Sequence, residues 1–214
     1  VPDAPFALHG ELLRACGEGL ITDAAVDAAL ARQDVLMRKL SPFRSSPAAD
    51  TLRCPEHLAF NAEAAPACLA WASAGRFGLK AGDTVGYLEP LTAPGAWQGG
   101  AFAEGLSALG VRVEPYRPGM RLAAGCFSRP RAGSGSINLA AEERAALEAA
   151  IAGAPESVVL AFGSPFVLDG LKPSAALCAF CSLEDFQRAA ADALAGKIKA
   201  GGSMPVKVSR LENI

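Results

Sequence analysis

Short apolar segments alternate with helix-like segments over most of the chain, and this alternation constrains the fold more than any other feature. The clearest segment, Ser157–Phe162, is apolar throughout, which is typical of a strand that is buried on both faces of a sheet. Strands that are separated by helices run parallel and carry those helices on both faces. The pattern therefore predicts an α/β three-layer sandwich around a mostly parallel sheet of five to six strands.

The expected elements can be placed along the sequence, and the arrangement that they predict is flavodoxin-like. Strands are predicted at Thr84–Leu88, Val111–Tyr116, Leu122–Phe127, Ser157–Phe162 and Ala175–Phe180, with a terminal strand at Met204–Val208 that we expect to run antiparallel at an edge. Helices are predicted at Asn61–Trp71, Ala96–Leu109 and Leu139–Ile151, followed by a helix that Ser182 caps. Pro66 fits best in a first helical turn, so we expect the first of these helices to start late or to kink.

Two further helices are predicted before this α/β region. The first covers about Pro5–Cys16, and the second begins at a Thr22 or Asp23 cap and carries apolar side chains at spacings of three and four as far as Leu40. Residues 41–56 begin with a Ser- and Pro-rich stretch and are predicted to be a linker. The predicted organisation is residues 1–40, the linker 41–56 and the sandwich 57–214. The N-terminal helices have no partner in their own segment.

Composition excludes several classes of protein. Hydrophobic residues make up 51% of the 214-residue chain and charged residues 20%, which excludes intrinsic disorder. A formal net charge of -2 favours neither nucleic acid nor an anionic membrane as a partner, and no apolar stretch approaches the length of a membrane span. Six cysteines without a disulfide framework fit a reducing cytoplasm, which is the location that we expect. The chain begins at Val1 rather than at a methionine, which suggests that an upstream segment has been removed.

Cysteine and histidine do not form a predicted metal site. Cys178 and Cys181 form the one C-x-x-C pair, and no second pair completes a zinc site. A redox function for this pair is the alternative to two buried thiols, since the pair precedes a predicted helix. His9 and His57 are isolated in the sequence. No metal and no cofactor is therefore expected.

Ligands of open α/β sheets bind beyond the carboxyl ends of the strands, and this rule selects the candidate residues. Substrate-side or interdomain candidates follow the first, third and fourth predicted strands, namely Glu89, Ser128, Arg129, Arg131 and Ser164. The two arginines could hold a carboxylate, sugar hydroxyls or an acidic rim of another domain, or they could lie in a solvated loop. The chain has no G-x-G-x-x-G after its first strand, no phosphate-binding G-K-S/T and no G-x-S-x-G elbow.

The segment Val158–Val208 resembles the end of the C-terminal domain of glycoside hydrolase family 3. The resemblance rests on a buried strand followed by Gly163-Ser164-Pro165-Phe166, a helix with Gln187-Arg188-Ala189-Ala190, and Gly-x-Met-Pro-Val near Gly202–Val206. Ser128–Leu147 is similar to the preceding loop and helix of the β-N-acetylhexosaminidase-like branch. Leu12–Leu40 looks like the helices that close the family's N-terminal (β/α)8 barrel.

This resemblance implies an accessory domain of a glycosidase that removes terminal β-linked N-acetylglucosamine, or a related β-hexose, from glycans. It implies that the barrel bears the nucleophile, so no catalytic residue is expected in this chain, which alone would be inactive. The expected partners are that barrel and a carbohydrate substrate. Glu89, Glu184 and Asp185 are possibilities for the general-acid glutamate that the domain lends in the glucosidase branch. Phe180 and Cys181 depart from the family, which often has a tyrosine and a small polar residue there.

Two alternatives to the glycosidase domain remain open. The chain could be a non-enzymatic structural or sugar-binding module whose barrel is inactive, and the activity of the full-length protein separates these two readings. It could also be a free-standing flavodoxin-like regulator, which predicts a native mass of 21.9 kDa.

Overall fold

A computed structural model of the chain describes residues 5–43, 54–73, 75–128 and 139–208. The chain divides into two compact units, Val1–Cys54 and Pro55–Ile214, which we describe separately. The helices and strands, in chain order, are α1 (Pro5–Gly17), α2 (Asp23–Leu40), α3 (Pro55–Cys68), β1 (Ala70–Trp71), β2 (Thr84–Leu88), α4 (Gly100–Ala108), β3 (Arg112–Pro115), β4 (Leu122–Cys126), α5 (Ala141–Ala152), β5 (Ser157–Ala161), β6 (Ala175–Cys178) and α6 (Glu184–Leu194). Short 3₁₀ helices are η1 (Ser41–Phe43), η3 (Pro94–Ala96) and η4 (Pro165–Leu168).

The first unit contains α1 and α2, as the sequence predicts. The hydroxyl of Thr22 accepts a hydrogen bond from the backbone N–H of Ala25 and caps α2. None of the described residues of this unit is buried, although both helices carry leucines. A helix gains most of its stability from packing of an apolar face, so this unit has no core of its own.

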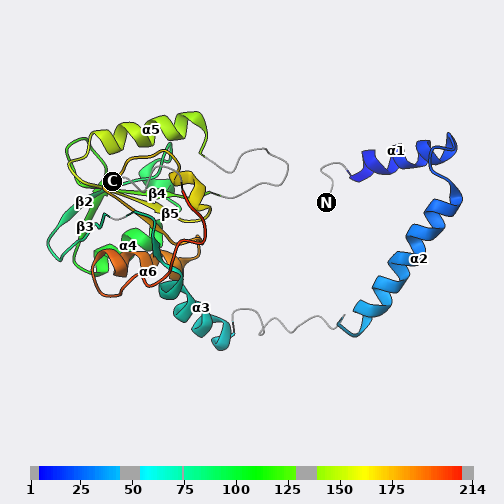
Figure 1. Ribbon diagram of the computed structural model, residues 1–214, viewed down its shortest axis with the longest axis horizontal. Coiled ribbons are helices and arrows are strands. Elements are labelled where there is room, and N and C mark those ends of the chain that lie inside the picture. The colour runs from blue at the N-terminus through cyan, green and yellow to red at the C-terminus, as the bar shows by residue number, and fades with distance from the viewer. Residues whose placement is uncertain (1–4, 44–53, 74, 129–138, 209–214) are drawn as a thin grey trace. The chain divides into compact units, whose positions relative to one another are not determined.

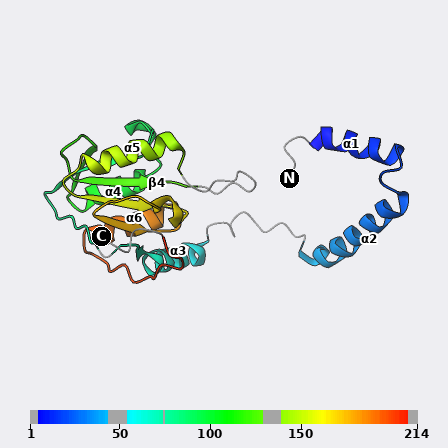
Figure 2. The same cartoon turned by 45° about the horizontal axis from the view of Figure 1, so that its top comes forward.

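The second unit is an α/β sandwich, and the predicted fold class is confirmed. Its six-stranded sheet has the order β1-β6-β5-β4-β2-β3, in which every pair is parallel except the antiparallel pair of β1 and β6. Figures 1 and 2 show α5 on one face of the sheet and α4 with α6 on the other. The predicted apolar strand β5 is buried at all five positions, because helices cover both of its faces.

Side chains alternate between two cores, one on each face of the sheet. Val158 and Leu160 of β5 join the core under α4 and α6, whereas Val159 and Ala161 join the core under α5. This is the two-residue period of a strand.

At the amino ends of the strands, Arg121 is held by several groups of neighbouring loops. It forms ion pairs with Asp83 at 3.2 Å and with Glu156 at 2.7 Å, and it donates to the carbonyl of Gly78 at 2.7 Å.

The predicted helix Asn61–Trp71 is wrong at both ends. Helix α3 begins at Pro55, because a proline is favoured in the first turn, where its missing N–H is not needed. Pro66 lies instead near the carboxyl end of α3, and the helix ends two residues later. Ala70–Trp71 leaves the helix and forms β1.

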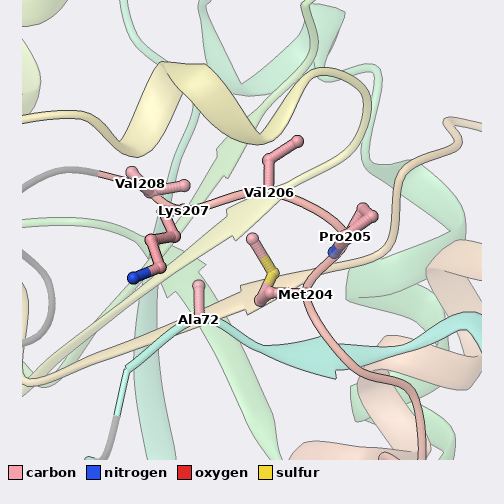
Figure 3. Close-up of a pocket in the computed structure, with 6 residues that line it drawn as sticks. All are labelled: Ala72, Met204, Pro205, Val206, Lys207 and Val208. Carbon is pink, nitrogen blue, oxygen red and sulfur yellow. The ribbon is translucent and has the colours of Figure 1, made fainter.

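The predicted terminal strand Met204–Val208 is also wrong, since this segment is irregular. An antiparallel edge strand exists, but β1 provides it and pairs with β6 through Trp71 and Leu177. That place beside β6 is therefore taken, and Pro205 has no N–H to donate to a sheet. Figure 3 shows Met204–Val208 passing beside Ala72, which follows β1.

Two helix starts differ from the prediction because other groups bind the backbone there. Helix α4 begins at Gly100 rather than at Ala96, after a separate 3₁₀ turn, η3. Helix α6 has Leu183 as its N-cap, without a side-chain cap, so Ser182 does not cap it. The backbone carbonyl of Ser182 instead accepts a hydrogen bond from the side chain of Gln187.

Candidate functional site

The carboxyl ends of the parallel strands β2, β4, β5 and β6 meet at one edge of the sheet, which we call the carboxyl edge. Three of the predicted site residues are described there. Glu89 follows β2, Ser128 lies two residues after β4, and Ser164 lies in the loop after β5. Arg129 and Arg131 lie outside the described residues. The carboxyl edge is where an open α/β sheet binds ligands, so it is the candidate site.

Glu89 is buried, with only 2% of its surface exposed. Its Oε1 accepts hydrogen bonds from the Tyr87 hydroxyl at 3.0 Å and from the backbone N–H of Gly99 at 2.6 Å. Its Oε2 accepts from the backbone N–H of Gln98 at 2.9 Å. Both carboxylate oxygens therefore bind donors of the protein itself.

The position of these donors explains how the chain accommodates a buried carboxylate. Gly99 is the N-cap of α4, and a helix N-terminus carries free N–H groups and a partial positive charge. Burial raises the pKa of Tyr87, and the charge of Glu89 raises it further, so this phenol stays protonated and donates. The Tyr87 ring also contacts Trp97 edge-to-face, with ring centroids 4.8 Å apart.

Gln187 of α6 forms a second buried polar cluster beside the first. Its Oε1 accepts from the backbone N–H of Phe102 at 3.2 Å. Its Nε2 donates to the carbonyls of Ser182 at 2.8 Å and Gln98 at 3.2 Å. Gln187 was not among the predicted site residues. The available signal was a glutamine within the otherwise apolar inner stripe of the last predicted helix.

Ser128 and Ser164 are brought together, as their positions after neighbouring strands suggest. The backbone N–H of Ser164 donates to the Ser128 hydroxyl at 2.8 Å. Gly163, between β5 and Ser164, has φ 150°, and a side chain at this position would overlap the backbone carbonyl of Ser128. The pair joins the loops after β4 and β5.

Two non-glycine residues of the carboxyl edge have a left-handed backbone. Leu91, in the turn after β2, has φ 58°, and Phe180, after β6, has φ 60°. Such residues cost free energy and concentrate at functional sites. Large apolar side chains are exposed on three loops of this edge, with 64% of Leu91, 37% of Phe166 and 53% of Leu183 accessible. The edge combines strained backbone with exposed apolar surface.

Cys178 and Glu184 have structural explanations. All six cysteines lie among the described residues and are free thiols. Burial raises the pKa of Cys178 to about 12, which favours the thiol over the thiolate at this residue. Glu184 forms an ion pair with Arg188 one turn later in α6, at 3.3 Å. Within the described residues, no group of three His, Cys, Asp or Glu could hold a metal ion.

A pocket of about 240 Å³ lies away from the carboxyl edge, near the amino end of β6. Its lining is Ala72 and the segment Met204–Val208 (Figure 3). Lys207 is the one charged side chain of this lining. A single exposed lysine offers no preorganised set of polar groups, so we do not assign a ligand to this pocket.

Comparison with known proteins gives a match to the fold but not to the sequence. No protein-family model matches the chain, and no curated protein matches it. Among solved structures, a β-glucoside phosphorylase named BglX is similar, with a TM-score of 0.69 and 17% identity over 94% of this chain and 42% of its own. A glycoside hydrolase family 3 β-N-acetylglucosaminidase from Paenibacillus sp. str. FPU-7 has a TM-score of 0.61 and 16% identity over 92% of this chain and 42% of its own. A fungal multi-domain GH3 β-N-acetylglucosaminidase has a TM-score of 0.63 and 13% identity over 95% of this chain and 25% of its own.

These matches confirm, at the level of the fold, the resemblance to a domain found in glycoside hydrolase family 3. The chain spans about two fifths of the first two proteins and a quarter of the third. Pro55–Ile214 makes up about three quarters of the chain, so a coverage of 94% extends into Val1–Cys54. The similarity is therefore not confined to Pro55–Ile214.

Proposed function

We propose that this chain is an accessory domain of a longer glycosidase similar to the β-N-acetylhexosaminidases of glycoside hydrolase family 3. The observation that carries the proposal is the fold match to BglX, which takes in 94% of this chain and only 42% of that protein. A match of this kind is expected of one part of a larger protein. The activity then belongs to the whole protein.

The proposed substrate is a glycan with a terminal β-linked N-acetylglucosamine or a related β-hexose. Two of the similar structures are named as β-N-acetylglucosaminidases, which supports the amino sugar. BglX is named as a β-glucoside phosphorylase, which supports a test of β-glucosides and of inorganic phosphate as the acceptor.

We also propose that the 214-residue chain alone does not turn over substrate. Retaining hydrolysis needs two carboxyl groups about 5–5.5 Å apart on either side of the scissile bond. Glu89 is buried with its oxygens engaged by three donors, and Glu184 is paired with Arg188. Two of the three possibilities for a general acid therefore have other partners in the structure, whereas Asp185 stays a possibility.

The proposed partner of the chain is a catalytic (β/α)8 barrel in the same polypeptide. Exposed apolar side chains of the first unit support this proposal: Phe6, Leu8, Leu12, Leu13, Leu20, Val26, Leu30, Val35, Leu36, Met37 and Leu40. They lie on α1, α2 and the turn between these helices. An apolar surface of this extent on two helices without a core is expected to be covered by other protein.

Turnover of chromogenic β-N-acetylglucosaminide and β-glucoside, with and without inorganic phosphate, tests the proposal. We expect no turnover by the purified 214-residue chain. We expect turnover by the protein that the complete coding sequence specifies, and a native mass above 21.9 kDa. Turnover by the chain alone would refute its proposed inactivity.

An inactive full-length protein would favour the alternative, a structural or sugar-binding module whose barrel is itself inactive. A coding sequence that specifies only this chain would exclude both readings.

A cytoplasmic location, proposed from the six free thiols, is checked by fractionating the source cells. No helix in the described ranges is both long and apolar enough to span a bilayer.

A further inference from the structure

The buried carboxylate of Glu89 is the feature of the carboxyl edge that the proposed function does not use. It lies at the amino end of α4, where Gln98 and Gly99 direct two backbone N–H groups at it. This is the kind of position at which a helix N-terminus binds phosphates and carboxylates. Here a side chain of the same chain occupies it.

Besides the two backbone N–H groups, a tyrosine hydroxyl and the glycines that make room for it adapt this position to a carboxylate. The Tyr87 hydroxyl supplies a third donor from β2, at 3.0 Å from Oε1. Glycine at positions 99 and 125 leaves room for this phenol, because a side chain at either position would overlap the Tyr87 hydroxyl. Among the described residues, no lysine, arginine or histidine forms an ion pair with Glu89, so neutral donors stabilise its charge.

We propose that Glu89 is an intramolecular ligand, which fills the anion-binding position after β2 and thereby fixes the loop between β2 and α4. The bound loop spans residues 89–99 and presents Leu91 at the carboxyl edge. The position is closed to outside ligands in the native chain, so substrate of the proposed longer protein does not bind there. The inference stands independently of that proposed function, since it concerns this chain alone.

The chemistry of the site defines a direct test with the 214-residue chain. Glu89→Ala keeps Cβ and removes one methylene and one carboxylate, which together match an acetate ion. The vacated position keeps the Tyr87 hydroxyl and the two backbone N–H groups as donors. Acetate is expected to bind there and to restore stability, with a saturable dependence on its concentration.

We expect Glu89→Ala to lower the Tm by about 5–10 °C, because three buried donors lose their acceptor. Sodium acetate should recover at least half of this loss, whereas sodium chloride at equal ionic strength should not. Glu89→Gln should also lower the Tm. Its amide NH₂ group would replace a carboxylate oxygen that accepts a hydrogen bond, so two donors would face each other. Acetate should not rescue this variant, because the amide still fills the position.

The matched control is Glu104→Ala, which removes an exposed glutamate from the same helix and should leave the Tm and its acetate dependence unchanged. If Glu89→Ala does not fold in buffer, its recovery is followed by near-ultraviolet circular dichroism during refolding with acetate. Failure of acetate to raise the Tm or to promote this refolding would overturn the inference. So would a Glu89→Gln variant as stable as the native chain.

Discussion

Gln187 of α6 accepts a hydrogen bond from the backbone N–H of Phe102, which lies 85 positions earlier in the first turn of α4. The same side chain donates to the carbonyls of Gln98 and Ser182. One buried amide thus satisfies a donor at the start of α4 and acceptors in the segments before α4 and α6. The two helices on this face of the sheet are joined by polar contacts as well as by their apolar core.

Gln187→Leu is expected to reduce the free energy of unfolding by about 2–3 kcal/mol, because it leaves buried backbone groups without a partner. Urea denaturation of the 214-residue chain measures the change. Arg188→Leu is the matched control. The side chain of Arg188, next to Gln187 in the sequence, is exposed, and its ion pair with Glu184 contributes little to stability. Equal effects of the two substitutions would contradict the role assigned to Gln187.

Gly125→Ala in β4 is expected to destabilise the chain by about 1–3 kcal/mol, because the new methyl group would overlap the Tyr87 hydroxyl. Tyr87→Phe removes that oxygen, so the double variant should lose less stability than the sum of the single variants. A double-mutant cycle by urea denaturation measures this coupling. Gly95→Ala has open space around it and serves as the control, with little change expected.

Stability should fall as the pH rises above 9, because burial raises the pKa of both Cys126 and Cys178 from 9.0 to about 12. Below pH 9 both thiols are protonated in the folded and the unfolded chain. Between pH 9 and about 12 they ionise only in the unfolded chain, which favours unfolding by about 1 kcal/mol per thiol and pH unit. The decline in a Cys126→Ala, Cys178→Ala variant should be shallower. Parallel pH profiles for the two proteins would count against this explanation.

Deletion of residues 1–54 is expected to leave the sandwich folded with an unchanged urea midpoint. The reason is that both described core clusters of Pro55–Ile214 are built from residues of that unit itself. The shortened chain should also bind less of an apolar dye, since it lacks the exposed leucines of α1 and α2. A lower midpoint after the deletion would show that the two units stabilise each other.

Much of the fold could be predicted from sequence because the parallel strands are strongly apolar. Ser157–Phe162 indicated a central strand, and it is one. Ala70–Trp71 could not be predicted as β1, since two residues show no periodicity and its pairing with β6 is made more than 100 positions later in the chain. Met204–Val208 had the composition of an edge strand, but the edge was already occupied. The local sequence pattern cannot show which of two segments pairs with β6 at the edge of the sheet.

The candidate site was predicted in position more than in detail. The rule that ligands bind beyond the carboxyl ends of strands selected Glu89, Ser128 and Ser164, which all lie at that edge. It could not show that Glu89 would be buried and would accept hydrogen bonds from backbone N–H groups nine and ten positions later in the chain. Gln187 was missed because the partners of a buried amide depend on how helices pack. The assignment of Arg129 and Arg131 stays a prediction.

The two outer strands of the sheet are short. β1 has two residues, and β3 has four and ends at Pro115, which has no N–H to offer. Long, unprotected edges template strand addition and fibrils, whereas edges of this kind resist both. Self-association of the purified 214-residue chain should therefore proceed through side chains of the helices and loops and should not increase its β-sheet content.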